Sequence, residues 1–328
     1  MKNIQKSVAA LCLLSGLSYG VQAAELSLAY FMGPKHSMNK GVFTPFGDKL
    51  NELSGGDLTV KQYPGGALNK SAAKQYSILL DGVADITFTI PGYTADVFPK
   101  TNVISLAGVC DSSVECTENL QRARTELEAE YNAKVLALWT NEPPVLITRN
   151  KPVRTLEDLE GMKIRVTSKA DAAFVEALGA SAVAQSVSEI NQNLANGVID
   201  AIMIDPSAIK SFKLHEVAKH INTWFPGSGS PFALLMSKQV YDDLSAEEKG
   251  WVDEASGPEL SMSGARAYGA ASAEGLKLAA DSGLELIDFP ESERARFEAL
   301  IEDAMSDIGK QAAGDKTIGD MIKIMQGQ

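Results

Sequence analysis

Short stretches in which apolar and polar residues alternate recur along the chain, and most are followed by segments with helical spacing. In residues 162–166, three apolar side chains alternate with Lys163 and Arg165, which is the period of two expected of a strand. Residues 37–53 instead place their apolar side chains on one helical face and end at a Ser-Gly-Gly sequence. Repeated alternation of this kind predicts an α/β fold with mainly parallel sheets.

The same two patterns locate the other expected elements. Strands are predicted at residues 25–31, 58–63, 85–90, 134–139, 145–149, 182–184, 200–204, 221–225, 232–236 and 284–289. Helices are predicted at residues 71–80, 112–131, 170–178, 188–194 and 292–308. A capping box from Ser245 to Glu248 opens a long helical region that reaches about residue 280. The tail, residues 311–328, is expected to be helical and weakly anchored.

Two segments rich in Pro and Gly, residues 140–144 and 226–231, predict where the chain crosses between two lobes. A chain of 328 residues is long enough to give each lobe its own core. The first lobe is expected to contain residues 25–142 and about 230–270, and the second lobe residues 143–229 and about 271–328.

Residues 1–24 have the features of a secretory signal peptide. Two lysines precede an apolar run, and small residues end the segment at a cleavage site after Ala23 or Ala24. The run is too short to cross a bilayer, and no other stretch is long and apolar enough to do so. We therefore expect a mature protein in the periplasm.

The net charge of −12 argues against nucleic acid or an anionic membrane as a partner. A small anion would then need a local cation, and Arg165 lies at the carboxyl end of a predicted strand. Ligands of open α/β sheets bind at such ends, and the planar fork of an arginine matches a carboxylate. The alternative is an exposed surface arginine.

Cys110 and Cys116 are the cysteines that remain after the predicted signal peptide. In an oxidising compartment they suggest a disulfide, with two buried thiols as the alternative. No histidine lies within ligand spacing of them, and the sequence has no nucleophile elbow or phosphate-binding loop. We therefore expect no metal, no cofactor and no enzymatic activity.

An ordered set of motifs connects this chain to a known family. In the second half these are LEDLEGMKIRV at residues 156–166, then ALGA (177–180), SEIN (188–191), LANGVID (194–200) and HEVAK (215–219). In the first half and near the end they are LSGG (53–56), YPGGAL (63–68), GVADI (82–86), MSK (236–238) and LSAEE (244–248). In this order and spacing they resemble the solute-binding proteins of TRAP transporters, of the dicarboxylate-binding (DctP) type.

The resemblance implies a two-lobe periplasmic binding protein in which each lobe is a mixed sheet flanked by helices and one long helix spans both lobes. It implies that Arg165 clamps the carboxylate of a small organic anion, that the lobes close around it, and that the small and large membrane subunits receive it. We expect a monomer. The alternatives are a periplasmic ligand sensor that presents its closed form to a receptor, and a periplasmic enzyme that acts on an organic acid.

Other candidate ligand residues follow from their positions near predicted strand ends and crossings. The aromatic candidates, each of which could instead be plain core, are Tyr30, Phe31, Phe88, Tyr93, Trp139 and Phe232. The polar candidates are Thr89, Gln75 and, as a second cation, Arg149.

Asp205 follows the strand predicted at residues 200–204 and precedes Pro206. If its carboxylate faces the cleft it can only accept hydrogen bonds, so it would need a ligand hydroxyl, a ligand ammonium or a bound cation. Alternatively, Asp205 caps the following helix, or Ile204 faces the cleft in its place.

Overall fold

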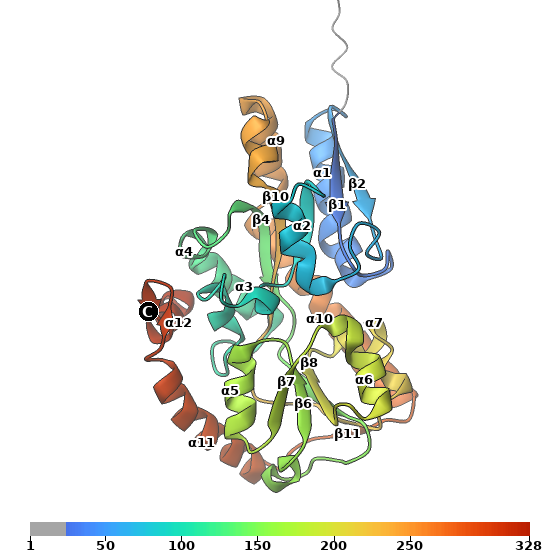
Figure 1. The fold of residues 1–328 in the computed structure, drawn as a ribbon, viewed down its shortest axis with the longest axis vertical. Coiled ribbons are helices and arrows are strands. Elements are labelled where there is room, and N and C mark those ends of the chain that lie inside the picture. Colours follow the sequence, from blue (N-terminus) through green and yellow to red (C-terminus); the bar gives the residue numbers. More distant parts are fainter. Residues whose placement is uncertain (1–23) are drawn as a thin grey trace, which may run out of the picture.

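A computed structural model describes residues 24–328, without the side chains of residues 169 and 170, and contains two lobes that are each built on one sheet (Figure 1). The predicted signal peptide lies almost wholly outside the described residues. The first sheet has five strands in the spatial order β2 (Leu58–Tyr63), β1 (Ala24–Ala29), β3 (Ile86–Thr89), β10 (Pro231–Ser237) and β4 (Ala133–Thr140). The second sheet has six strands in the order β11 (Glu285–Ile287), β9 (His220–Asn222), β5 (Val145–Thr148), β8 (Ala201–Ile204), β6 (Lys163–Val166) and β7 (Ser181–Ala184). The predicted α/β class is confirmed.

Strand direction brings particular residues to the edge where the lobes face each other. In the first sheet β1 and β3 run parallel, whereas β10 is antiparallel to both β3 and β4, so β10 begins where these two strands end. In the second sheet β6 and β8 run parallel, whereas β5 is antiparallel to β8 and begins where β8 ends. The carboxyl ends of β6 and β8 therefore share one edge, and the carboxyl end of β5 lies at the opposite edge.

Helices cover both faces of each sheet, and an apolar cluster lies under each layer. The first lobe contains α1 (Thr44–Leu53), α2 (Gln75–Leu80), α3 (Ser113–Arg122), α4 (Arg124–Glu128), α8 (Lys238–Asp243) and α9 (Ala246–Ala255). The second lobe contains α5 (Lys169–Ala177), α6 (Ile190–Asn196) and α7 (Ser207–Ser211). The single helix predicted at residues 37–53 begins as a π-helical turn, Asn39–Phe43, and the helix predicted at residues 112–131 is interrupted at Ala123.

The long helix α10 (Pro258–Asp281) contacts both lobes, since it packs against β4 and α3 of the first and α7 of the second. Two glycines permit these approaches. A Cβ at Gly264 would lie 2.9 Å from the Trp139 ring, and one at Gly275 would lie 2.1 Å from the backbone oxygen of Pro206. The predicted helical region is not continuous, because Gly257, with φ of 100°, separates α9 from α10.

The C-terminal segment returns to the first lobe. Helix α11 (Glu291–Ile308) packs against α5, whereas α12 (Ile318–Gln326) packs against α3 (Figure 1). A short hairpin of β12 (Ala312–Ala313) and β13 (Lys316–Thr317) joins them. The expectation of a weakly anchored tail is wrong, because Met321 and Met325 are fully buried in the first lobe. The assignment of all residues from about 271 to the second lobe fails for the same reason.

Cys110 and Cys116 form a disulfide at the start of α3, so they are not two separate thiols in this structure. Among the helices of the described chain, none has both the length and the apolar character that a membrane crossing requires.

Candidate functional site

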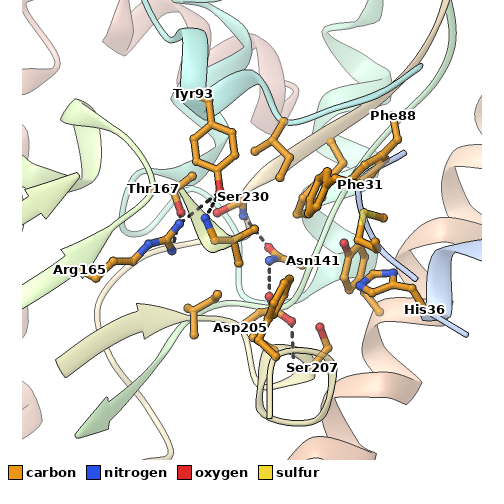
Figure 2. Close-up of a pocket in the computed structure, with 18 residues that line it drawn as sticks. Phe31, His36, Phe88, Tyr93, Asn141, Arg165, Thr167, Asp205, Ser207 and Ser230 are labelled. Carbon is orange, nitrogen blue, oxygen red and sulfur yellow. Dashed lines mark hydrogen bonds between the residues drawn. The ribbon is translucent and has the colours of Figure 1, made fainter. Parts of the chain in front are cut away.

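A cavity lies between the lobes, where strand ends of both sheets converge, and it encloses about 490 Å³ of empty space when the part open to solvent is included (Figure 2). Six of the residues proposed from sequence line it, namely Phe31, Phe88, Tyr93, Arg165, Asp205 and Phe232. Ile204 lines the cavity as well, so both Ile204 and Asp205 face the cleft, and neither does so in place of the other.

Arg165 reaches the cavity from β6 and is only 1% exposed, so it is not a solvated surface arginine. Its Nε and Nη2 atoms donate to the backbone oxygen of Gln185 at 3.1 and 2.8 Å. Nη1 donates to Thr167 Oγ1 at 3.2 Å, and Nη2 donates to the Tyr93 hydroxyl at 3.4 Å (Figure 2). A guanidinium fixed in this way is already oriented for an anion.

A buried carboxyl group, that of Asp171, lies near the guanidinium of Arg165. Asp171, in the first turn of α5, accepts a hydrogen bond from the backbone of Ser168 at 3.0 Å and completes a capping box with it. Burial raises the pKa of Asp171, and the bonds from Ser168 and the charge of Arg165 oppose that rise. Asp171 therefore lies near enough to Arg165 to feel its charge, but it does not line the cavity.

Asp205 is 5% exposed, and it both holds the start of the following helix and faces the cavity, the two roles that the sequence left open. Its Oδ2 accepts a hydrogen bond from the Ser207 backbone at 3.0 Å, which holds the start of α7, and it also lines the cavity. Its Oδ1 accepts from Asn141 Nδ2 at 2.6 Å, and Asn141 Oδ1 accepts from the backbone of Ser230 at 2.7 Å (Figure 2). Burial raises the pKa of Asp205, and the bonds from Ser207 and Asn141 oppose the rise.

Stacked rings form the apolar wall of the cavity. Phe88 and Phe232 stack with ring centroids 5.4 Å apart, and Phe232 stacks on Tyr268 at 5.0 Å. Phe31 completes the wall at 5.9 Å from Phe88. These rings offer a flat, apolar surface beside the guanidinium of Arg165.

Sequence reasoning missed Asn141, Tyr268 and His36, which all line the cavity. Tyr268 lies in the apolar stripe of α10, where the spacing indicates ordinary core. His36 has no other candidate ligand residue at metal-ligand spacing in the sequence, and burial lowers its pKa to about 4, so it is neutral at neutral pH. Asn141 lies in the predicted crossing at residues 140–144, where a polar residue beside the breaker was the only available signal.

Three residues proposed from strand ends lie outside the cavity. Trp139 is fully buried against Phe88, whose ring centroid is 5.8 Å away, and against α10. Tyr30 points to the opposite face from Phe31 and donates to Gln62 Oε1 at 2.8 Å. Thr89 alternates with Phe88 in the same manner, and its hydroxyl lies 3.3 Å from that of Thr87.

Gln75 and Arg149 also lie outside the cavity. Gln75 is buried in the first lobe, where Nε2 donates to the backbone oxygens of Asn69 and Ser71 at 2.9 and 3.0 Å. Arg149 follows β5, which ends at the opposite edge of its sheet because it runs antiparallel to β8. It lines a different surface pocket together with Asp200. The proposal of a second cation in the cleft is therefore wrong.

Comparison with known proteins agrees with this geometry. A solute-binding protein of Albidiferax ferrireducens is 29% identical over 213 residues, and the match spans 62% of this chain and 62% of that protein. The sialic acid-binding periplasmic protein SiaP of Vibrio cholerae is 26% identical over 227 residues, which cover 67% of this chain and 70% of SiaP.

Solved structures resemble the whole described fold. A TRAP solute-binding protein of an unidentified marine microbe, specific for aromatic acid ligands and in complex with 3-hydroxybenzoate, has a TM-score of 0.85 at 26% identity, over 93% of this chain and 97% of that chain. A TRAP solute-binding protein of Rhodoferax ferrireducens T118 with copurified benzoate has a TM-score of 0.82 at 26% identity, over the same fractions, 93% and 97%.

These relatives are binding proteins rather than enzymes, as the sequence predicted. The sequence profile of the bacterial extracellular solute-binding proteins, family 7, matches residues 28–311. The resemblance found in the motifs is therefore confirmed, and this chain belongs to the DctP family of bacterial extracellular solute-binding proteins.

Proposed function

We propose that the protein captures a small organic acid between its two lobes, with the carboxylate at Arg165, and delivers it to the membrane subunits of a TRAP transporter. The observation that carries the proposal is a buried arginine that lines the cavity beside a wall of aromatic rings. A cation in such a place requires an anionic partner to offset its desolvation.

The donor inventory of Arg165 leaves room for that partner. A guanidinium has five N–H donors, and four hydrogen bonds from it go to Gln185, Thr167 and Tyr93. One Nη1 donor remains for a ligand oxygen. The hydroxyls of Thr167 and Tyr93 accept from Arg165, so their own protons can also turn toward a carboxylate.

The stacked rings suit the apolar body of the acid. Two relatives at 26% identity bind the aromatic acids 3-hydroxybenzoate and benzoate, which supports a one-ring acid as the first ligand to test. The predicted signal peptide, the periplasmic location of SiaP and the family assignment support capture in the periplasm, by a protein that we expect to be monomeric.

A thermal-shift screen followed by calorimetry tests the proposal. The panel contains organic acids, sulfonates, zwitterions and neutral sugars, because a ligand that binds only the folded state raises the melting temperature. We expect an acid to bind the wild type and to bind Arg165→Ala at least about 100-fold more weakly, since a buried charge pair loses one partner. Arg149→Ala is the matched control and should bind like the wild type.

Arg165 also holds the backbone of Gln185, so Arg165→Ala could lose affinity by unfolding. Circular dichroism of the variant, and Arg165→Lys, which keeps the charge but not the fork, separate these effects. Tight binding of a neutral sugar that is equal in the wild type and in a folded Arg165→Ala would refute the proposal.

A further inference from the structure

The cavity has a second charged pole, and it is negative. Among the described residues that line the cavity, Arg165 and Asp205 are the charged ones, because His36 is neutral. Figure 2 shows these two side chains reaching the cavity from different elements, with Asn141 linked to Asp205. A ligand whose carboxylate occupies Arg165 therefore presents some other group to Asp205.

The fixed partners of Asp205 leave it able to accept further hydrogen bonds. The Ser230 backbone N–H can only donate, so it orients the Asn141 amide with the oxygen toward Ser230 and the nitrogen toward Asp205. The Ser207 backbone N–H likewise can only donate, and it faces Oδ2. The Ser207 side chain also hydrogen-bonds the carboxyl group, so three of its roughly four acceptor sites have donors from the protein and one remains for a ligand. When it is ionised, the group has no proton of its own to offer.

Tyr268 lines the same cavity and is close enough to Asp205 for the charge of that carboxylate to act on it. Its hydroxyl makes no hydrogen bond to any residue that the structure describes, although Tyr268 is only 4% exposed and lines the cavity. Burial, together with the nearby charge of Asp205, keeps Tyr268 protonated and able to donate. A ligand hydroxyl matches both neighbours, because it can donate to Asp205 and accept from Tyr268, whereas an ammonium cannot accept.

We infer that Asp205 is a specificity-determining residue for a hydroxyl group, so that the ligand class is a hydroxylated monocarboxylic acid rather than a dicarboxylic acid. The inference rests on the proposed capture of an acid by Arg165. A second ligand carboxylate at this pole would face the buried Asp205 carboxyl group, and two carboxyl groups in one low-dielectric site repel strongly when both are ionised. A ligand methyl group would leave the acceptor unmatched.

Two matched series of acids test the inference on the purified protein by calorimetry at pH 7.5. The aromatic series is 3-hydroxybenzoate, 3-methylbenzoate, isophthalate and 3-(aminomethyl)benzoate. The aliphatic series is 5-hydroxypentanoate, hexanoate, glutarate and 5-aminopentanoate. We expect the hydroxy acid to bind at least about 10-fold more tightly than each of its analogues in one series, the size of effect expected for a hydrogen bond to a charged acceptor.

The variant Asp205→Asn replaces one acceptor oxygen by a donor. We expect the advantage of the hydroxy acid over the methyl analogue to fall below about 3-fold. Asp200→Asn is the matched control, because Asp200 precedes the other end of β8 and also accepts from a backbone N–H, that of Lys163 at 2.9 Å. It should keep the full advantage.

The outcomes separate this inference from the proposed function. If acids bind through Arg165 but the methyl, dicarboxylate or ammonium analogue equals the hydroxy acid in both series, the Asp205 inference is wrong and the capture of acids stands. If no acid binds, both fail. The wild-type comparison decides the matter even if Asp205→Asn does not fold.

Discussion

Tyr93 of the first lobe and Arg165 of the second lobe meet across the cavity, where the Tyr93 hydroxyl accepts a hydrogen bond from Arg165 Nη2 at 3.4 Å. The same hydroxyl accepts from the backbone N–H of Val187, also in the second lobe, at 2.7 Å. Tyr93 lies in the 3₁₀ turn Pro91–Thr94, directly after β3. One phenol therefore joins the lobes at the residue that we propose holds the ligand carboxylate, which links binding to closure.

Removing that hydroxyl should favour the open form. In Tyr93→Phe the ring remains, but the N–H of Val187 loses its partner in the closed state, at a cost of about 1–2 kcal/mol. We expect ligand affinity to fall by about 5- to 30-fold, mainly through faster dissociation, because the binding-competent closed state becomes less populated. Calorimetry and stopped-flow fluorescence with the best acid of the screen would measure both quantities.

Tyr76→Phe is the matched control for this effect. The Tyr76 hydroxyl also accepts a backbone N–H, from Asn132 at 3.1 Å, but both residues lie within the first lobe. Its loss should lower the free energy of unfolding and leave ligand affinity unchanged. Equal affinity losses in the two variants would show that Tyr93 acts through general stability and not through closure.

The sequence predicted most strands to within one or two residues, because alternation of apolar and polar side chains is a local property. It also placed Arg165 and Asp205 at the cavity, since both follow from where parallel strands end. It failed for Arg149, because strand polarity in a mixed sheet depends on pairing between residues far apart in the chain. The break at Gly257 shows the same limit within a helical region, because the local pattern is helical on both sides of it.

The rest of the site depends on contacts over long sequence separations. Asn141 and Asp205 are 64 residues apart, and no periodicity links them. Tyr268 has the spacing of a core residue on α10, and only the three-dimensional packing shows that it lines the cavity. Some of the aromatic candidates line the cavity and others lie in the core, depending on which face of the sheet their side chain occupies. A shift of one residue along a strand moves a side chain to the opposite face.

Gly275 should be intolerant of any side chain, because α10 approaches the loop that carries Asp205 at this point. In Gly275→Ala the new Cβ would lie 2.1 Å from the backbone oxygen of Pro206, so the helix or the loop must shift. We expect the free energy of unfolding to fall by about 1–3 kcal/mol, as measured by urea denaturation. The variant should also weaken ligand binding, because Asp205 moves with its neighbour.

Gly250→Ala serves as its comparison. Gly250 is an exposed glycine within α9, and a Cβ there meets nothing within 4 Å. Alanine should stabilise the helix by up to about 1 kcal/mol. A Gly275→Ala variant that gains stability in the same way would contradict the close packing of α10 on the second lobe.

The disulfide between Cys110 and Cys116 should contribute to stability and hold the second crossing. The backbone N–H of Cys110 donates to Ser228 Oγ at 3.2 Å, and that hydroxyl donates to the Cys110 oxygen at 2.8 Å. For the double variant Cys110→Ser/Cys116→Ser we expect a loss of about 2 kcal/mol, the amount that closing so short a loop provides. Reductant should lower the urea midpoint of the wild type and leave that of the variant unaltered.

The half-buried His36 should make the protein less stable in mild acid. Its pKa is lowered to about 4 by burial, whereas an unfolded histidine titrates near 6.5, so between these values the unfolded state binds more protons. The free energy of unfolding should therefore fall as the pH drops from about 6.5 to about 4, by on the order of 2 kcal/mol. His36→Gln should flatten this part of the profile in urea denaturation. The control is His220→Gln, at the far end of the second sheet beside Glu285, which should leave the dependence of stability on pH as steep as in the wild type. If His36→Gln also leaves it as steep, the loss of stability in acid does not come from His36.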